Sequence, residues 1–166
     1  MLTTLIMPSS STIIHQARSE HDSIIAQHFY QLWLDNNVQK DIIHDDWLDI
    51  TLTFIRDARQ KLKFQAFIAQ VEAEIVGSVS CQLFAGLYPS VFKAEHRNYG
   101  YIWNVYVQPD YRRQGIATQL TKAAIAYLQS LNCTKAVLNA SLSGKPVYEQ
   151  LGFVAGNEMT LNLLLE

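Results

Sequence analysis

Apolar residues recur at every third or fourth position in three long stretches of this 166-residue chain. Because that spacing collects side chains on one face of a helix, it predicts helices over about 22–34, 45–62 and 115–131. A shorter helix is expected over 146–151. The helix over 45–62 is predicted to bury a stripe formed by Trp47, Ile50, Phe54, Ala58 and Leu62.

Runs of β-branched and aromatic residues alternate with these helices and predict a sheet. The predicted strands are 13–16, 64–71, 75–84, 101–107, 135–140 and 159–165. Only Glu72, Ala73 and Glu74 separate 64–71 from 75–84, which predicts an antiparallel hairpin. Apolar and polar residues alternate along 75–84, so one face of that strand is expected to be buried.

The order of the elements indicates the fold class. The helix over 115–131 lies between the strands 101–107 and 135–140, as in a crossover that joins parallel neighbours. Helices also precede the hairpin, so an α/β (α+β) fold is predicted. At this length the chain fits one domain, expected over 13–166 behind a flexible leader at 1–12.

Composition and charge narrow the classes of function. The net charge is −2 and no charge runs occur, which argues against binding to nucleic acid or to a membrane surface. Cys81 and Cys133 stand far apart in apolar contexts, so buried free thiols in a cytoplasmic protein are expected. The histidines have no metal-ligand spacing, no metal is expected, and His28 should be packed on its apolar helical face. The stretch 85–98 is long for a connection, which favours a functional lip.

The segment 112–117, Arg-Arg-Gln-Gly-Ile-Ala, carries the clearest chemical signal of the chain. It follows the predicted strand 101–107, which Pro109 ends because proline cannot donate a further ladder hydrogen bond. Gly115 and Ala117 then open the next helix. A strand, a basic turn and a helix N-terminus in that order direct several N–H groups and a helix dipole to one place. An anion is expected to bind there.

Two segments together resemble a known family. Residues 105–117 are similar to the acetyl-CoA-binding motif of the GNAT acetyltransferase superfamily, Arg/Gln-x-x-Gly-x-Gly/Ala after a strand that ends in Val-x-Pro. Residues 147–153, Val-Tyr-Glu-Gln-Leu-Gly-Phe, are similar to the Tyr-Glu-x-Leu-Gly-Phe segment of that family. The helices and strands before these motifs come in the matching order, so the resemblance extends from about Ile13 through nearly the whole chain.

The resemblance implies a mostly antiparallel sheet in which the strand 101–107 splays from its parallel neighbour to admit acetyl-CoA as cosubstrate. N–H groups from about Arg113 to Thr118 would hold the diphosphate, and the arginines would add charge. An N–H near Val105 would polarise the thioester carbonyl, as an oxyanion-hole donor does. The residues implied to bind the cosubstrate are Val105, Val107, Arg112, Arg113, Gln114, Gly115, Ile116, Ala117, Thr118 and Asn139.

Tyr148 is the catalytic residue that the resemblance implies. When an acetyl group passes from a thioester to an amine, the leaving thiolate must be protonated. A phenol with a pKa of about 10 stays protonated at neutral pH and can donate to that sulfur. The alternative is an aromatic ring that only supports Phe153. Asn139 or Ser141 could contact the CoA arm from the other strand, or could simply satisfy local backbone groups.

The sequence identifies neither the general base nor the acceptor. An amine with a pKa near ~10 must lose a proton before attack, and the strand 101–107 offers no obvious base. A water chain could end on His44, Asp45, Asp46, Glu95 or His96. Residues 21–60 carry seven acids against three bases, which would favour a cationic acceptor or merely keep helix surfaces soluble. The acceptor site could be walled by the aromatic residues Trp33, Trp47, Tyr88 and Trp103, or these could pack in the core.

The sequence therefore predicts an acetyl-CoA-dependent N-acetyltransferase that moves an acetyl group by direct transfer to a primary amine of a small molecule or peptide. One alternative is a non-catalytic acyl-CoA-binding module, and another is an acetyltransferase for protein or peptide N-termini. A homodimer could form, since the closing strand 159–165 offers an edge that can pair.

Overall fold

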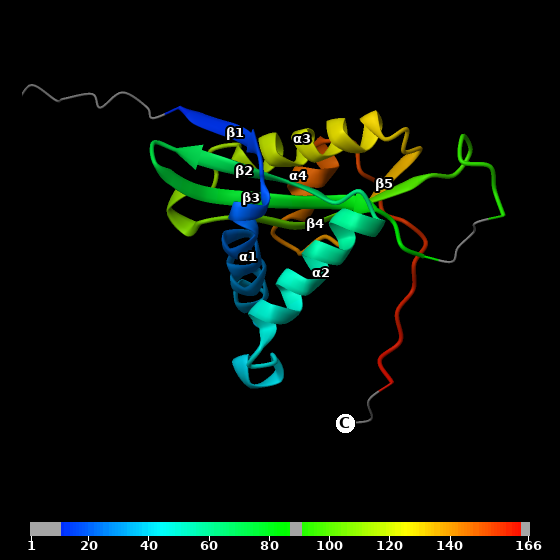
Figure 1. Ribbon diagram of the computed structural model, residues 1–166. Coiled ribbons are helices and arrows are strands. Elements are labelled where there is room, and N and C mark those ends of the chain that lie inside the picture. The colour runs from blue at the N-terminus through cyan, green and yellow to red at the C-terminus, as the bar shows by residue number, and fades with distance from the viewer. Residues whose placement is uncertain (1–10, 87–90, 164–166) are drawn as a thin grey trace, which may run out of the picture.

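A five-stranded sheet forms the centre of the protein (Figure 1). The computed structural model describes residues 11–86 and 91–163. The strands lie side by side in chain order and are β1 (Thr12–Gln16), β2 (Gln65–Val71), β3 (Glu74–Leu83), β4 (Tyr99–Val107) and β5 (Lys135–Val137). The first three neighbouring pairs are antiparallel, and β4 and β5 are parallel. This arrangement confirms the predicted hairpin, the predicted parallel pair and the predicted fold class.

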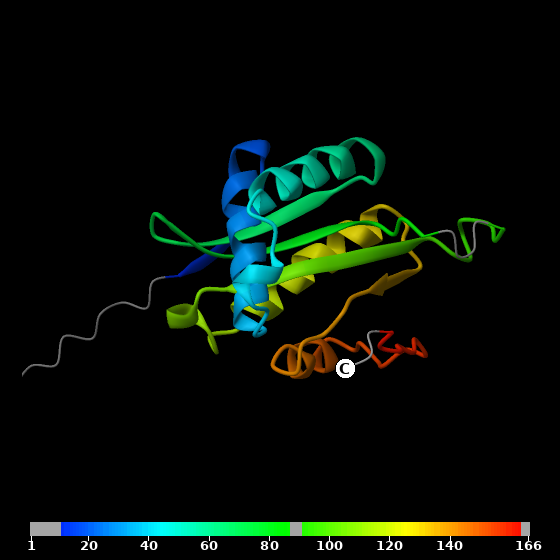
Figure 2. The ribbon, with the colours of Figure 1, turned by 90° about the horizontal axis from the view of Figure 1, so that it is seen from below.

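Helices cover both faces of the sheet. α1 (Asp22–Asp35) and α2 (Trp47–Lys61) contact each other below the sheet in Figure 1, and α3 (Ile116–Ser130) lies above it. α4 (Lys145–Gln150) follows β5 and touches α3, and it flanks the sheet beside β4 (Figure 2). Three short 3₁₀ turns complete the described elements, η1 (Ser19–His21), η2 (Lys40–Ile42) and η3 (Pro109–Tyr111).

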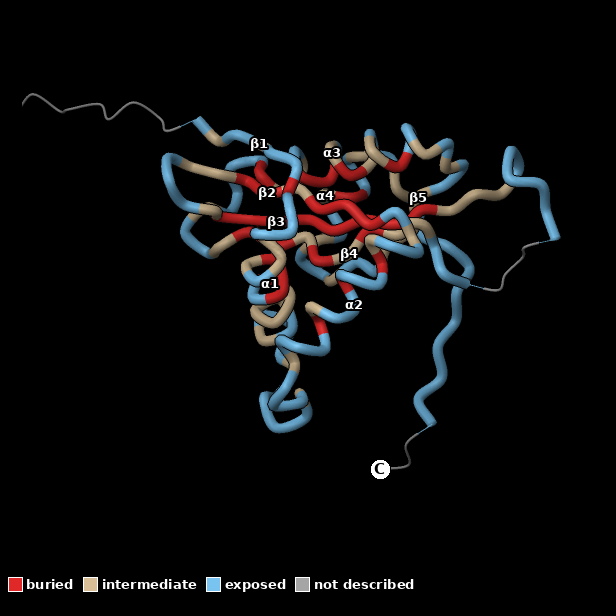
Figure 3. Tube along the Cα trace, in the orientation of Figure 1, coloured by how far each residue is buried: buried red, intermediate tan, exposed pale blue. Residues whose placement is uncertain are grey.

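Each face of the sheet has an apolar core of its own, which Figure 3 shows as buried segments along the central strands. Val79 and Leu120 are fully buried on the α3 side, and Ile25 and Ile55 are fully buried on the side of α1 and α2. β3 is therefore covered on both faces rather than on one. Three of its polar side chains, those of Ser78, Ser80 and Gln82, are buried as well.

The predicted apolar stripe of α2 is only partly right. The helix buries Thr51, Ile55 and Ala58, whereas Ile50 and Phe54 are about half exposed. The C-terminal end of α2 meets the sheet and its N-terminal end projects away from it (Figure 1). The face that meets the sheet is thus displaced by one residue from the predicted stripe.

Two strand predictions differ from the structure near the C-terminal end. β5 ends at Val137 rather than at residue 140, because the chain turns away from β4 toward α4. The strand predicted over 159–165 is wrong for its described part, 159–163, which forms no strand. The alternating apolar side chains are present, but they are more than four-fifths exposed at Met159, Leu161 and Leu163. With only three residues, β5 offers too short a ladder to hold this segment.

Other predictions concern segments that the structure describes in part. The leader predicted at 1–12 lies outside the described residues up to residue 10, and Thr12 belongs to β1. In the loop 85–98, residues 87–90 lie outside the described residues, and the remainder forms no helix or strand. Cys81 and Cys133 are free thiols, buried and half-buried. In the described ranges no helix is both long and apolar enough to cross a membrane, and no three potential metal ligands cluster.

Candidate active site

A cleft of about 970 Å³ opens where β4 and β5 separate. The two strands pair over only three residues each, and the last pair is Tyr101 with Val137. Beyond this pair β4 continues to Val107, while the other chain segment turns toward α4 (Figure 2). The outer edge of β4 is thereby left without a neighbouring strand, as the predicted splay requires.

A bulge bends β4 at the middle of this cleft. Ser80 is opposite Trp103 and Ser78 is opposite Tyr106, so two residues of β4 face Val79 alone. One of the two, Asn104, has a φ of 53°, which is a left-handed conformation typical of such bulges. The other, Val105, is paired with neither β3 nor β5. On the side of the cleft, Val105 therefore has no strand neighbour.

The turn before α3 forms a cradle of backbone N–H groups at one end of the cleft. Arg113 and Gly115 have φ values of 61° and 78°, and α3 begins at Ile116. Among the described residues, no backbone carbonyl accepts a hydrogen bond from the N–H groups between Arg113 and Thr118. Unpaired N–H groups at the N-terminus of a 15-residue helix attract an anion through their own dipoles and through the helix dipole.

Nine of the ten residues predicted to bind the cosubstrate line this cleft. They are Val105, Val107, Arg112, Arg113, Gly115, Ile116, Ala117, Thr118 and Asn139. Gln114 does not line it, and its side-chain amide donates instead to the carbonyl of Asp110 at 3.4 Å. The predicted catalytic residue, Tyr148, lies in the same cleft.

The two arginines of the cradle have different surroundings. The Arg112 guanidinium bonds the Asp35 carboxylate at 2.5 Å and donates to the carbonyl of Val107 at 2.8 Å. It also lies 5.7 Å from the centre of the Tyr106 ring. Arg113 forms no ion pair with any described residue and is exposed. Among the described residues Arg113 therefore has no charged partner, whereas the partly exposed side chain of Arg112 is already engaged by Asp35 and by the carbonyl of Val107.

Tyr148 is the buried phenol of the cleft. It lies in the last turn of α4, with only 9% of its surface exposed. Its ring meets that of Phe153 edge to face at 5.9 Å, and its carbonyl accepts the Phe153 N–H at 3.0 Å. Burial raises the pKa of Tyr148 to about 12. The phenol consequently keeps its proton throughout the neutral range.

Asn139 and Ser141 continue the chain beyond β5 along the cleft. The Asn139 amide donates to the hydroxyl of Tyr101 at 3.2 Å, so it bridges the two sides of the splay. The Ser141 hydroxyl accepts a hydrogen bond from the N–H of Gly144 at 3.1 Å, just before α4 begins. Ser141 thus does satisfy a local backbone group.

A buried polar cluster behind β4 was not predicted from the sequence. The His28 ring lies 2.9 Å from the Ser78 hydroxyl through Nδ1, and the Asn104 amide donates to the Ile25 carbonyl at 3.1 Å. The His28 ring also packs against Tyr106, with ring centres 4.8 Å apart. Burial lowers the pKa of His28 to about 4, so the ring is neutral. His28 is packed as predicted, but no pattern in the sequence connects it with the bulge.

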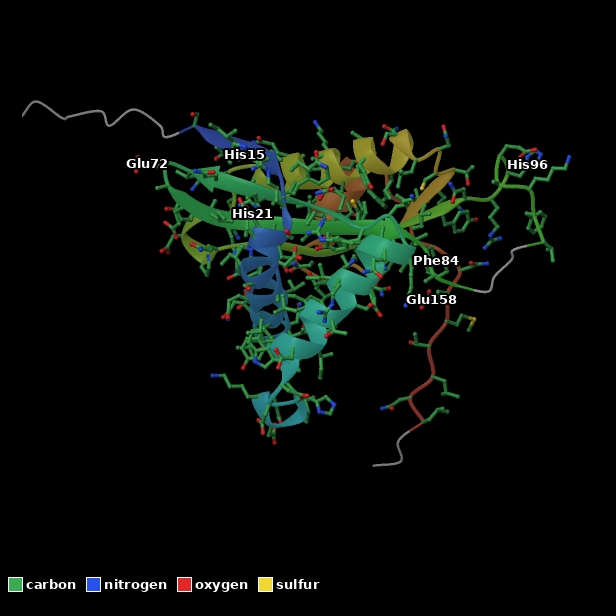
Figure 4. All side chains as sticks on the ribbon, viewed as in Figure 1. His15, His21, Glu72, Phe84, His96 and Glu158 are labelled. Carbon is green, nitrogen blue, oxygen red and sulfur yellow. The ribbon has the colours of Figure 1, made fainter. Side chains whose placement is uncertain are left out.

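The candidate general bases lie away from the cleft. None of the five lines it, and Figure 4 shows His96 far out on the loop between β3 and β4. Of the seven acids between residues 21 and 60, only Asp35 lines the cleft. Trp33 and Trp103 line the cleft, and Trp103 also packs against the core on the side of α1 and α2, whereas Trp47 stacks on Tyr30 outside the cleft. Tyr88 lies outside the described residues.

Known proteins are similar to this chain in sequence and in fold. The model of the acetyltransferase (GNAT) family matches residues 26–153. N-alpha-acetyltransferase 30 of Xenopus laevis is 36% identical over 91 residues, which cover 53% of this chain and 31% of that protein. Glucosamine 6-phosphate N-acetyltransferase of Trypanosoma brucei brucei is 32% identical over 117 residues, covering 69% of this chain and 76% of that protein.

A solved structure agrees over almost the whole chain. A predicted acetyltransferase with acetyl-CoA from Clostridium acetobutylicum has a TM-score of 0.78 and 25% identity, covering 92% of this chain and 97% of that one. By contrast, the chain spans less than a third of the length of the Xenopus laevis relative. The match to the family over residues 26–153, together with the Trypanosoma brucei brucei relative, decides the assignment. This chain belongs to the GNAT acetyltransferase family.

Proposed function

We propose that the protein transfers an acetyl group from acetyl-CoA directly to a primary amine. The observation that carries this proposal is the common location of the N–H cradle and Tyr148 in one cleft. A diphosphate held at the cradle leaves the CoA arm to run along the unpaired edge of β4. The thioester at the end of that arm can then reach Tyr148.

The donor would be held mainly by backbone groups. The N–H groups from Arg113 to Thr118 surround the diphosphate, and the exposed guanidinium of Arg113 adds a positive charge. Residues of β4 beyond Tyr101 have no partner on β5, so their backbone groups can bond the amides of the pantetheine arm. Asn139 faces the arm from the other side of the splay.

The transfer itself is a nucleophilic substitution at the thioester carbon. The amine nitrogen attacks this carbon, and the N–H of Val105 at the bulge stabilises the negative charge that develops on the carbonyl oxygen. The new C–N bond forms, the C–S bond breaks, and the Tyr148 hydroxyl donates its proton to the departing thiolate. The nitrogen loses its extra proton to solvent, so an amide and free CoA result.

Family membership leaves the acceptor open. The printed names of two relatives point to different amines, an N-alpha amine in one and glucosamine 6-phosphate in the other. The lining of the cleft is therefore a better guide to the acceptor of this chain than either name.

The direct test is to follow thiol release from acetyl-CoA with a panel of amines and to identify the products by mass. We expect release that depends on the amine and a product heavier by one acetyl group. Saturable binding of CoA without turnover on any amine would instead support a non-catalytic acyl-CoA-binding module. A chain that does not bind acetyl-CoA saturably would contradict both.

A further inference from the structure

We propose that the acceptor carries its amine on an apolar or aromatic body without a second charge. This inference rests on the proposed function and specifies its acceptor. It follows from two properties of the part of the cleft between α1 and β4, which are the pairing of its charges and the aromatic side chains on its wall.

Charged side chains are scarce in the cleft. Among the described residues that line it, only Asp35, Arg112 and Arg113 carry a charge. Asp35 is bonded to Arg112, so its carboxylate is not left for a second ammonium group. Arg113 belongs to the cradle, where the donor diphosphate would bind. The wall nearer to α1 thus offers no unpaired charge to an acceptor.

Aromatic rings occupy that wall instead. Phe29 and Trp33 project from α1, and Trp103 projects from β4 beside the bulge. Phe29 meets Trp33 at 5.6 Å and Trp103 at 5.0 Å, both edge to face, so the three rings form one continuous wall. The indole N–H of Trp103 is already bonded to Gln82 at 3.3 Å. The wall is therefore built mainly of apolar ring surface, and the indole N–H of Trp103 is not free for a ligand.

Trp33 shows that this wall is open to a ligand. It lines the cleft, yet 45% of its surface is exposed. An apolar group that covers this ring removes apolar surface from water, which is favourable. A polyamine, an aminoglycoside or a sugar phosphate would bring a second charge that finds no partner here, which is unfavourable. Apolar amines should accordingly be preferred.

Two classes of acceptor carry an amine on an apolar body. They are small arylalkylamines and peptides whose first residue is apolar. The test therefore compares kcat/KM for four acceptors: 2-phenylethylamine, the peptide Leu-Ala-Ala-Ala with an amidated C-terminus and so no second charge, spermidine and glucosamine 6-phosphate. Both apolar amines should exceed spermidine and glucosamine 6-phosphate by about tenfold or more. The ratio between 2-phenylethylamine and the peptide identifies which class fits better.

The variant Trp33→Ala tests the aromatic wall. It should lower kcat/KM for the better apolar amine by about tenfold and leave the Kd of CoA within about twofold. Trp47→Ala is the matched control, because Trp47 stacks on Tyr30 outside the cleft and its loss should not change the order of the four amines. Thermal unfolding of both variants confirms that each is folded.

The possible results separate this inference from the proposed function. Preference for spermidine or glucosamine 6-phosphate would overturn the inference and leave the acetyl transfer intact. An equal loss in Trp33→Ala for all acceptors would overturn it as well, because the wall would then not select among amines. Absence of thiol release with every amine in an enzyme that binds CoA would overturn the proposed function instead.

Discussion

The guanidinium of Arg112 and the carboxylate of Asp35 meet at 2.5 Å, although 77 positions separate them in the chain. The contact ties the turn before α3 to the C-terminal end of α1, and these two segments bound the cleft. Because Arg112 also donates to the carbonyl of Val107, its side chain links this turn to the end of β4 as well. These contacts favour a positioning role for Arg112 beside its predicted role at the diphosphate.

Breaking this pair tests the positioning role. Asp35→Asn and Arg112→Ala should each lower the free energy of unfolding by at most about 1 kcal/mol, because both side chains are partly exposed. The double variant should lose no more than the larger single loss, since either change breaks the same contact. Urea unfolding of the four proteins measures the cycle. Fully additive losses would show that the two residues act independently.

A substitution at Gly115 tests whether the cradle needs its left-handed backbone conformation. Its φ of 78° is costly for any residue with a Cβ, although an added Cβ would meet no atom within 4 Å. Gly115→Ala should therefore destabilise the fold by about 1 kcal/mol or distort the turn, and CoA should bind about tenfold more weakly. Gly156→Ala is the matched control, because its Cβ also meets nothing and its φ lies outside the left-handed range. Calorimetric titration with CoA compares the two, and equal affinities would contradict the assigned cradle.

His28 should make the stability of the protein depend on pH. Burial lowers its pKa from 6.5 to about 4, so the folded protein disfavours the charged ring. The resulting stability is complete above pH 6.5 and is lost as the pH falls toward 4, by about 3 kcal/mol. Denaturant unfolding from pH 7 to 4 measures this loss. His28→Gln removes the titrating ring and should flatten the slope in this window, and an unchanged slope would show that other groups cause it.

The exposed segment 154–163 should contribute little to stability. Leu161 is 82% exposed, whereas Leu120 is fully buried under the sheet. Leu161→Ala should therefore change the free energy of unfolding by less than about 0.5 kcal/mol, and Leu120→Ala should cost about 2–5 kcal/mol. Urea unfolding provides both values. A large loss in Leu161→Ala would mean that this segment packs against the domain after all.

Local patterns account for most of the fold and for the cradle of N–H groups before α3. The spacing of Ile24, Ile25 and Phe29 is enough to place α1, and Gly115 after two arginines is enough to place the cradle. Contacts between distant segments were not predictable in this way. The bond from Arg112 to Asp35 and the one from His28 to Ser78 depend on how helices cross the sheet.

Near the C-terminal end, an alternating apolar pattern led to the prediction of a strand that the structure does not contain in residues 159–163. The alternation of Met159, Leu161 and Leu163 is typical of a strand, but a strand needs a partner of matching length. β5 ends at Val137 because the chain must leave β4 to open the cleft. The same splay that forms the site thus removes the ladder that the predicted strand requires.

The central claim is that Tyr148 protonates the departing thiolate. Its burial and its pKa of about 12 keep it protonated as the donor group. The most direct measurement is kcat for thiol release by Tyr148→Phe with the best amine, alongside the Kd of CoA. We expect kcat to fall by about 100-fold or more with an unchanged Kd. Tyr127→Phe, which removes a hydroxyl bonded to the carbonyl of Lys63 away from the cleft, should retain full turnover. Undiminished turnover in Tyr148→Phe would contradict the role assigned to this phenol.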